Sequence, residues 1–281
     1  MSTDVAVLTK ATATSVSKPL TSWGSDFAAF EGNPDFVLSL ARGLRIIESF
    51  EGRTEGQTVA EISSHTGLSR AVVRRFLITL ELLGYVEAVG KLYRLRHRML
   101  RLGLSYLSSN SLVAVAKPTL QRITEELDES SSICVLDGDE VLCVAGAVRK
   151  RLMSVGLSTG SRLPAYCSAL GRVLLAGMPE KQFMAYVERV ERRSLTRKTI
   201  VSRQEFVDEV RRVRSAGYSV IDEELEVGLR AIAVPILSSQ GAVAAALSIG
   251  TQSSRISVRE MQARFLPVLK DYAGLIGQFV S

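Results

Sequence analysis

The chain has 281 residues, of which 46% are hydrophobic and 23% charged, and its formal net charge is +6 at pH 7. This composition excludes a chain that is disordered throughout, and the length suffices for roughly two domains. The sequence has no apolar run of membrane-spanning length, and its three cysteines form neither a Cys-x-x-Cys motif nor a disulfide framework, which indicates a protein of the reducing cytoplasm that does not bind membranes.

The first residues are rich in Ser, Thr and Ala and lack the basic and apolar regions of a signal peptide. We expect residues 1–33 to form a flexible tail. Between Leu40 and Arg101 the chain carries 11 Lys/Arg and 6 Asp/Glu, so the positive charge is concentrated in a short block. Such a local excess favours a polyanionic partner.

Residues 33–50 are predicted to form the first helix, with Asn33 or Asp35 as its cap and Pro34 at an early helical position. The expected apolar stripe of this helix is Leu40, Leu44, Ile47 and Phe50.

Two closely spaced helices follow. Thr58 is expected to cap the first of them, with Glu61 as its capping-box partner, and Gly67 to end it. Ser69 is expected to cap the second, which runs to about Leu83. At about 100° per residue, this second helix has an apolar side and an opposite side that carries arginines. The apolar side comprises Val73, Phe76, Leu77 and Leu80, and the other side Ala71, Arg74, Arg75 and Ile78, with Arg70 at its edge.

The segment YVEAVGKLYRLR then alternates around Ala88–Gly90, as expected for a hairpin. Helix, short helix, tight turn, longer helix and hairpin in this order predict a winged helix-turn-helix DNA-binding domain over residues 34–96. A solvated basic helix followed by an ordinary hairpin is the alternative interpretation. The residues expected to contact DNA are Thr58, Ser69, Arg70, Ala71, Arg74, Arg75, Lys91, Tyr93 and Arg94.

Residues 97–110 are predicted to form a linker helix, with Leu100, Leu104 and Leu107 in an apolar line. This line is consistent with packing in a dimer and equally with packing on its own domain.

From residue 111 to 281 we predict a second domain of the α+β class, with helices flanking a largely antiparallel sheet. Apolar runs around Asp137-Gly138 predict a hairpin, and the segment 151–178 predicts a strand, a loop and a helix from about Cys167. Helices are predicted over 202–217 and 257–279, and three strands between Ser219 and Gly250.

Five motifs of this chain are similar to those of one protein family. They are SLARGLRIIESF, TVAEISSHTGLSRAVVRRFLITLELLGYV, LPAYCSALGRVLLA, VGLRAIAVPI and GAVAAALSIG. The chain resembles the IclR family of bacterial transcriptional regulators, and most closely its members that control aromatic-acid catabolism (protocatechuate or 4-hydroxybenzoate, β-ketoadipate pathway). The resemblance implies a GAF-like effector-binding domain behind the linker helix, a small organic acid as effector, and homodimers or dimers of dimers on double-stranded operator DNA.

The resemblance also implies which residues line the effector site. They are Tyr166, Cys167, Ser168, Ala169, Leu170, Ile221, Leu229, Ala231, Ser248 and Gly250. Because Ile221, Ala231 and Gly250 are apolar or small, we expect a flat aromatic ring rather than a very small polar acid.

Recognition of a carboxylate requires amide, hydroxyl or guanidinium donors. Arg149 and Arg162 are candidate counter-charges, although a solvated surface role is the more common one for such arginines. Ser154 and Tyr166 are candidates for ring hydroxyls or for a purely structural role. The glutamates Glu223, Glu224 and Glu226 are interpreted as loop solvation, with Glu224 a minor candidate for the site.

No metal, cofactor or catalytic activity is expected. The only histidines, His65 and His97, lie in the N-terminal block, so Cys167 lacks a nearby histidine base. Cys134 and Cys143 are interpreted as packing residues rather than redox sensors. The alternatives to a regulator are a small-acid hydrolase or transferase that uses Cys167, and a DNA-organising protein without an effector.

Overall fold

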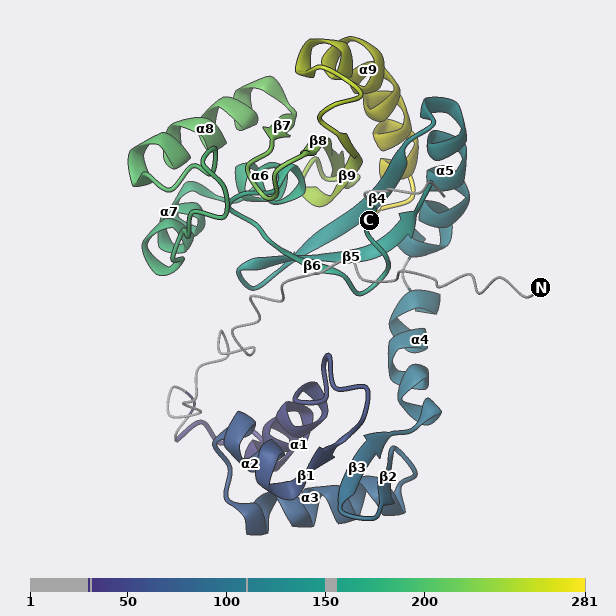
Figure 1. Ribbon diagram of the computed structural model, residues 1–281, viewed down its shortest axis with the longest axis vertical. Helices are drawn as coiled ribbons and strands as arrows, with labels where there is room; N and C mark the ends of the chain where they lie inside the picture. Colours follow the sequence, from purple (N-terminus) through teal and green to yellow (C-terminus); the bar gives the residue numbers. More distant parts are fainter. Residues whose placement is uncertain (1–29, 31, 110, 150–155, 281) are drawn as a thin grey trace, which may run out of the picture. The chain divides into compact units, whose positions relative to one another are not determined.

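The computed structural model describes residues 30, 32–109, 111–149 and 156–280 (Figure 1). Contacts divide the chain into two compact units that meet between Leu104 and Ser105, and each unit is described by itself. The predicted tail lies almost entirely outside the described residues. None of the described helices is both long enough and apolar enough to cross a membrane.

The first unit combines three helices with a small antiparallel sheet. Its elements are α1 (Leu38–Glu48), β1 (Gln57–Thr58), α2 (Val59–Thr66), α3 (Arg70–Leu82), β2 (Val86–Val89) and β3 (Leu92–Leu95). The sheet has the order β1-β3-β2, so the predicted hairpin gains a short third strand. The helices close around seven buried apolar residues, namely Ile46, Phe50, Ile62, Val73, Leu77, Leu80 and Val86. The predicted winged helix is therefore confirmed.

The start and end of α2 follow from local chemistry. The Thr58 hydroxyl accepts a hydrogen bond from the Glu61 amide at 3.3 Å, and the Glu61 carboxylate accepts one from the Thr58 amide at 2.8 Å. The Thr58 amide and hydroxyl both donate to the Glu61 carboxylate, and these two bonds lower the pKa of Glu61. Gly67 ends the helix in the left-handed conformation, at φ 70°. The predicted capping box is thus confirmed.

The first helix differs from its prediction. It begins at Leu38 and has no side-chain cap, because the Asn33 side-chain Oδ1 atom instead accepts the Asp35 amide at 3.0 Å in a turn ahead of the helix. Leu40 and Leu44 are exposed, whereas Ile46 is fully buried. Of the predicted stripe, Ile47 and Phe50 pack on the core of the unit as expected, whereas Leu40 and Leu44 do not. The hairpin turn lies at Gly90 and Lys91, slightly later in the chain than the predicted Ala88–Gly90.

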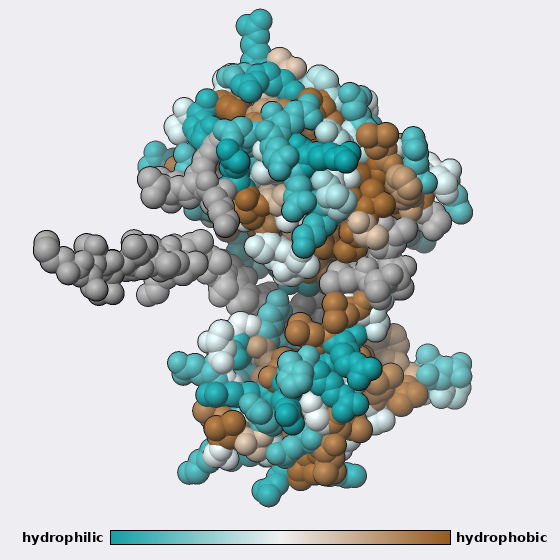
Figure 2. All heavy atoms as spheres, turned by 90° about the vertical axis from the view of Figure 1, so that its right-hand side faces the viewer, coloured by the Kyte–Doolittle hydropathy of each residue, from teal (hydrophilic) through white to brown (hydrophobic). Residues whose placement is uncertain are grey.

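A short 3₁₀ helix (His97–Met99) leads into α4 (Leu100–Ser109), which α5 (Ser111–Leu127) follows. Leu100, Leu102 and Leu104 of α4 are 67%, 52% and 56% exposed, and Figure 2 shows apolar residues at the surface of both units. The side chain of Leu107 is not among those described.

The second unit is built on a six-stranded antiparallel sheet with the order β6-β5-β4-β9-β8-β7. Its strands are β4 (Ser130–Asp137), β5 (Glu140–Ala147), β6 (Arg162–Pro164), β7 (Ser219–Asp222), β8 (Leu229–Leu237) and β9 (Val243–Gln252). One face is covered by α5 and α9 (Val258–Gly277), and the other by α6 (Ala169–Ala176), α7 (Glu180–Arg189) and α8 (Arg203–Ala216). The predicted α+β class is confirmed.

Successive side chains of each strand point to opposite faces of the sheet, and each face has its own hydrophobic core. In β8, Ile232 and Val234 pack toward α5 and α9, whereas Ala231 and Ala233 pack toward α6. Both faces of the sheet are therefore buried. The strand predicted near residue 151 falls partly on residues 150–155, which lie outside the described part, and α7 was not predicted from the sequence.

The helix α6 approaches the segment before it very closely. A Cβ atom added at Gly171 would lie 2.2 Å from the Ala165 carbonyl oxygen and 2.3 Å from its Cα atom. Only glycine permits this contact between α6 and the backbone that follows β6.

We predict that Gly171→Ala lowers the free energy of unfolding by about 2 kcal/mol or more, because backbone must shift to admit the methyl group. Gly274→Ala is the matched control: it lies in helix α9 with no atom within 4 Å of an added Cβ. That substitution should raise stability by about 0.5–1 kcal/mol through helix propensity. Urea denaturation followed by circular dichroism measures both. Equal effects of the two substitutions would contradict the packing argument.

Candidate DNA-contact surface and effector site

Helix α3 presents a basic side to solvent. The Ser69 hydroxyl accepts a hydrogen bond from the Val72 amide and so caps the start of the helix. In the view of Figure 1, α3 forms the lower edge of the first unit, and α1 and α2 lie above it. Arg70, Arg74 and Arg75 are all exposed, and none of them forms an ion pair with a described carboxylate. The predicted partition of this helix into a buried and a basic side matches what the structure shows.

The other residues predicted to contact DNA divide into two groups. Ala71 on α3 and Lys91 at the hairpin turn are exposed. Thr58 serves α2 as its cap, Tyr93 packs half-buried against the core of the unit, and the Arg94 Nε donates a hydrogen bond to the Glu55 carbonyl oxygen at 3.0 Å. Ala71 and Lys91 are therefore exposed and without a structural task, Arg94 is exposed with its Nε atom engaged, and Thr58 and Tyr93 are half-buried.

The strand register brings most of the predicted effector residues onto one face of the larger sheet. Ile221 pairs with Ala231, which pairs with Gly250, so that three strands contribute to one row. Leu229 and Ser248 have the same parity along their strands and lie on the same face, the one covered by α6. Residues from three strands thus lie on the sheet face that α6 covers.

A pair of buried hydroxyls lies in the neighbouring row. Ser248 pairs with Ser132 across β9 and β4, and their Oγ atoms lie 3.0 Å apart. Both side chains are buried. Ser132 was not predicted as a site residue, although a serine run at the start of an otherwise apolar strand is the signal that marks it.

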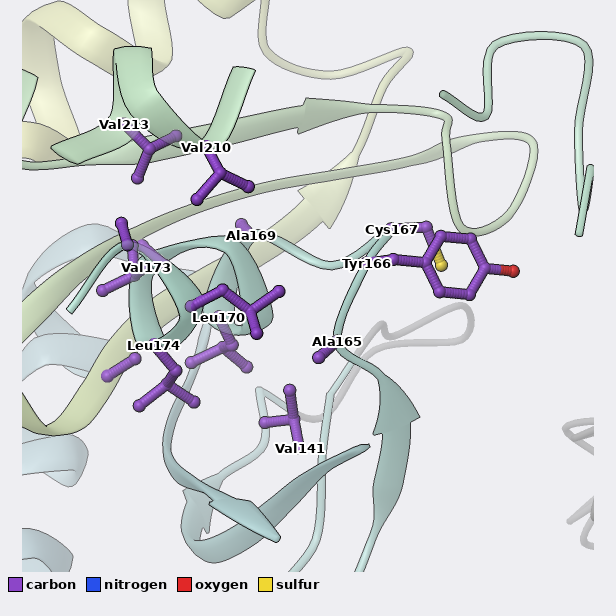
Figure 3. Packing of buried hydrophobic residues seen from close by; sticks show 14 of the residues in the cluster. Val141, Ala165, Tyr166, Cys167, Ala169, Leu170, Val173, Leu174, Val210 and Val213 are labelled. Carbon is purple, nitrogen blue, oxygen red and sulfur yellow. The ribbon is translucent and has the colours of Figure 1, made fainter. Parts of the chain in front are cut away.

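The segment between β6 and α6 supplies the other predicted contacts. Figure 3 shows the Tyr166 ring beside the Cys167 sulfur, and the Tyr166 hydroxyl donates to the Arg193 carbonyl oxygen at 2.9 Å. The helix begins at Ala169 rather than at Cys167, because the Ser168 hydroxyl accepts the Gly171 amide at 3.1 Å as its cap. The Ser168 hydroxyl is therefore already engaged. Ala169 and Leu170 are buried in the core.

The two arginines proposed as counter-charges bind carboxylates of the protein itself. Arg149 lies 2.7 Å from Asp128, and Arg162 lies 2.8 Å from Asp137 and 2.7 Å from Glu140. Neither is therefore a free cation for an effector. Ser154 lies outside the described residues.

The loop glutamates are not solvated in the way that the sequence suggested. Glu224 is buried and pairs with Arg172, which is itself fully buried on α6. Glu223 is half-buried and bonds Ser253 at 2.7 Å, and only Glu226 is exposed. A single arginine in the apolar run ALGRVLLA is the signal that points to this buried pair.

The three cysteines are buried and free. Burial raises the pKa of the Cys167 thiol to about 12, so it stays protonated at neutral pH and is a poor nucleophile. Cys134 and Cys143 face each other across β4 and β5 as free, buried thiols, and the contact with Cys143 together with burial raises the pKa of Cys134. The described residues contain no group of three His, Cys, Asp or Glu that could hold a metal ion.

Comparisons with known proteins agree with this architecture. Residues 39–90 match the IclR helix-turn-helix domain, and residues 104–277 match the C-terminal domain of the bacterial transcriptional regulator IclR. The chain is 44% identical over 242 residues to the Pca regulon regulatory protein of Pseudomonas putida, covering 86% of this chain and 83% of that protein.

Two further relatives concern aromatic acids by name. The p-hydroxybenzoate hydroxylase transcriptional activator of Acinetobacter baylyi is 34% identical over 251 residues, with coverage of 88% of this chain and 93% of that protein. The solved structure of an IclR homolog from Microbacterium hydrocarbonoxydans in complex with 4-hydroxybenzoate has a TM-score of 0.74 and 25% identity, covering 86% of this chain and 98% of that one.

The raised pKa values of Cys167 and Tyr166 predict a loss of stability in alkali. Burial raises their pKa values from 9.0 and 10.0 to about 12 each, so between about pH 9 and 12 the unfolded chain binds fewer protons than the folded one. The free energy of unfolding should therefore fall as pH rises through this window. Urea midpoints at pH 8 and pH 10.5 measure the fall, which should be smaller in Cys167→Ala. The same fall in both proteins would contradict the assignment to Cys167.

Proposed function

The chain belongs to the IclR family of bacterial transcriptional regulators, and we propose that it contacts operator DNA through α3 and responds to an aromatic carboxylic acid bound in its second unit. The observation that carries the DNA contact is the set of three exposed arginines on α3. A helix of this kind inserts into the major groove, where guanidinium groups bond guanine edges and phosphates. We expect the exposed Lys91 at the hairpin turn to contact the adjacent phosphate backbone.

The proposed effector class rests on the residues of the α6-facing side of the sheet. Ile221, Ala231 and Gly250 offer an apolar and shallow row that suits a flat ring, and the hydroxyls of Ser132 and Ser248 offer neutral partners for ring hydroxyl or carboxylate oxygens. The names of relatives that concern p-hydroxybenzoate and 4-hydroxybenzoate support the same class.

The relatives are named regulators, and nothing supports a hydrolase or transferase that uses Cys167. We infer a homodimer or a dimer of dimers in the cytoplasm. The exposed leucines Leu100, Leu102 and Leu104 of α4 support this inference, because leucines of one helix rarely remain in water without a partner. Effector binding would then favour one arrangement of the paired DNA-binding units over another.

Substitution of the α3 arginines tests the DNA contact. Arg74→Ala and Arg75→Ala should each weaken binding to an operator, selected from random DNA by the native protein, by roughly 1–3 kcal/mol where the side chain reads a base. A phosphate contact should instead weaken binding to all sequences similarly and lower the salt dependence. Fluorescence anisotropy at several salt concentrations separates the two cases.

Lys270→Ala removes one exposed positive charge from α9 of the second unit and serves as the control for net charge. It should leave operator binding within twofold of the native value. Unchanged binding in both α3 variants would contradict the assignment of α3 as the DNA-reading helix.

Calorimetric titration tests the effector class. We expect 4-hydroxybenzoate or protocatechuate to bind with about one equivalent per chain, and Ser248→Ala to weaken that binding about tenfold through loss of one buried hydroxyl partner. The effector should also raise the melting temperature of the native protein by mass action. Absence of binding for every hydroxybenzoate in the panel would contradict the proposed class and leave the DNA contact unaffected.

A further inference from the structure

Among the described residues of the second unit, the most deeply buried charge belongs to Arg172 on α6, whose side chain is 1% exposed. Its Nη1 atom donates to Glu224 Oε1 at 2.7 Å, and its Nη2 atom bonds the other oxygen of the same carboxylate. Its Nε atom donates to the Tyr166 carbonyl oxygen at 3.3 Å. All three nitrogens of the guanidinium group therefore have an acceptor, and the fork fixes Glu224 at two points.

A second carboxylate balances the charge around this pair. Glu209 of α8 lies 3.7 Å from Arg172 Nη1, and the same carboxylate receives two hydrogen bonds from Arg212, at 2.7 and 2.8 Å. Two arginines thus face two glutamates, so the cluster is formally neutral. It connects α6 and α8 to the turn between β7 and β8.

That turn, residues 222–228, is held from other sides as well, and we call it the acidic turn. The Thr199 hydroxyl donates to the Glu224 carbonyl oxygen at 2.6 Å, and the Thr196 hydroxyl donates to that of Glu223 at 2.7 Å. Glu223 has a φ of 61°, a conformation that costs a non-glycine residue energy unless its surroundings hold it. Its carboxylate accepts the Gly228 amide at 3.1 Å and so closes the turn on itself.

Salt bridges also hold the end of β7, the strand that leads into the acidic turn. Asp222 lies 2.9 Å from Lys198 and 2.7 Å from the Nε atom of Arg230. These contacts, together with those of Glu223, lower the pKa of both carboxyls, that of Glu223 to about 2. Asp222 and Glu223 therefore stay ionised and paired throughout the physiological pH range.

The Arg172–Glu224 pair joins the two segments that carry the proposed effector contacts. On one side, the guanidinium group binds the backbone of Tyr166, immediately before Cys167. On the other, Glu224 lies between β7, which ends just after Ile221, and β8, which begins at Leu229. The segments are more than 50 residues apart in sequence, and the Arg172–Glu224 pair joins them directly by side-chain hydrogen bonds.

A buried ion pair is weak evidence for stability, since two desolvated charges recover in attraction roughly what they lose in hydration. Apolar residues of similar volume often replace such pairs without loss of stability. What they do not reproduce is the bidentate geometry, which fixes distance and angle together.

We propose that Arg172 and Glu224 are positioning residues that set the spacing between the Tyr166–Leu170 segment and the acidic turn, and through it the affinity of the second unit for its effector. This inference rests on the proposed effector site for its functional consequence. The geometric part, that the pair holds these two segments together, stands independently of any ligand.

The decisive variant is the double substitution Arg172→Met with Glu224→Leu, which removes both charges of the pair together and leaves Glu209 paired with Arg212. We expect its melting temperature to stay within a few degrees of the native value. In hydrogen-exchange mass spectrometry of the full chain without ligand, peptides that cover 166–170 and 223–229 should exchange at least fivefold faster, while those of α9 remain unchanged. The single variant Glu224→Gln, which keeps the shape but weakens the pair, provides a second measurement should the double variant fold poorly.

Calorimetry with 4-hydroxybenzoate provides the functional measurement. The double variant should bind at least tenfold more weakly than the native protein, while the operator affinity of the unliganded protein stays within twofold. Glu188→Gln breaks an exposed arginine–glutamate pair with Arg203 and is the matched control, expected to change neither exchange nor affinity.

The outcomes are separable. Native exchange rates in the double variant would overturn the positioning role, and so would native affinity for the acid. A uniform rise of exchange over the whole second unit, with a large drop in melting temperature for both the double variant and Glu224→Gln, would show a purely structural pair and overturn it too. If the native protein binds no hydroxybenzoate, the proposed effector class fails, and the exchange measurement still decides the role of Arg172.

Discussion

The second unit depends on one constraint, which is that its antiparallel sheet is buried on both faces. Alternate side chains of β8 and β9 must therefore suit two different cores, and the large aliphatic residues gather on the side of α5 and α9. On the side of α6 the corresponding positions carry Ala231, Ala233, Ser248 and Gly250. Small residues on one face of a sheet leave room above it for a helix start, a loop or a ligand, and the proposed effector site follows from this asymmetry.

The first unit is small, and its seven buried apolar residues provide a modest core. Polar groups therefore contribute to holding its parts together. The buried Gln57 side chain donates to the Ser49 carbonyl oxygen at 2.7 Å and lies 2.8 Å from the His65 ring, so that it connects the ends of α1 and α2. Together with the capping box of α2, these bonds hold α1 and α2 beside the apolar core on which α3 packs.

Features set by neighbours in sequence were predictable. The two sides of α3, the caps of α2 and α8 and the hairpins all follow from residues three or four apart, or from a glycine that permits a positive φ. Features set by distant partners were not. Arg162 resembles a free cation until the strand register places Asp137 and Glu140 beside it. Glu224 resembles a loop residue until the fold brings Arg172, 52 positions away, into contact with it. Sequence patterns predict which side of a helix or strand is buried. They do not predict which charged residue will pair with another, because that depends on how the fold brings distant segments together.

The distribution of these counter-charges has a chemical consequence for the effector. Arg149, Arg162 and Arg172 each bind a carboxylate of the chain, so an incoming acid that displaced one of those carboxylates would leave it without its partner. That exchange changes the net charge little, but it gives up the bonding geometry of the original pair and leaves the displaced carboxylate desolvated without a partner. Neutral donors such as the Ser132 and Ser248 hydroxyls incur no such cost, and they respond to the position of a hydroxyl on a ring as well as to its charge. A site that relies on neutral donors distinguishes one hydroxybenzoate from another by the geometry of its hydroxyl groups, provided that the elements bearing these donors are held rigidly.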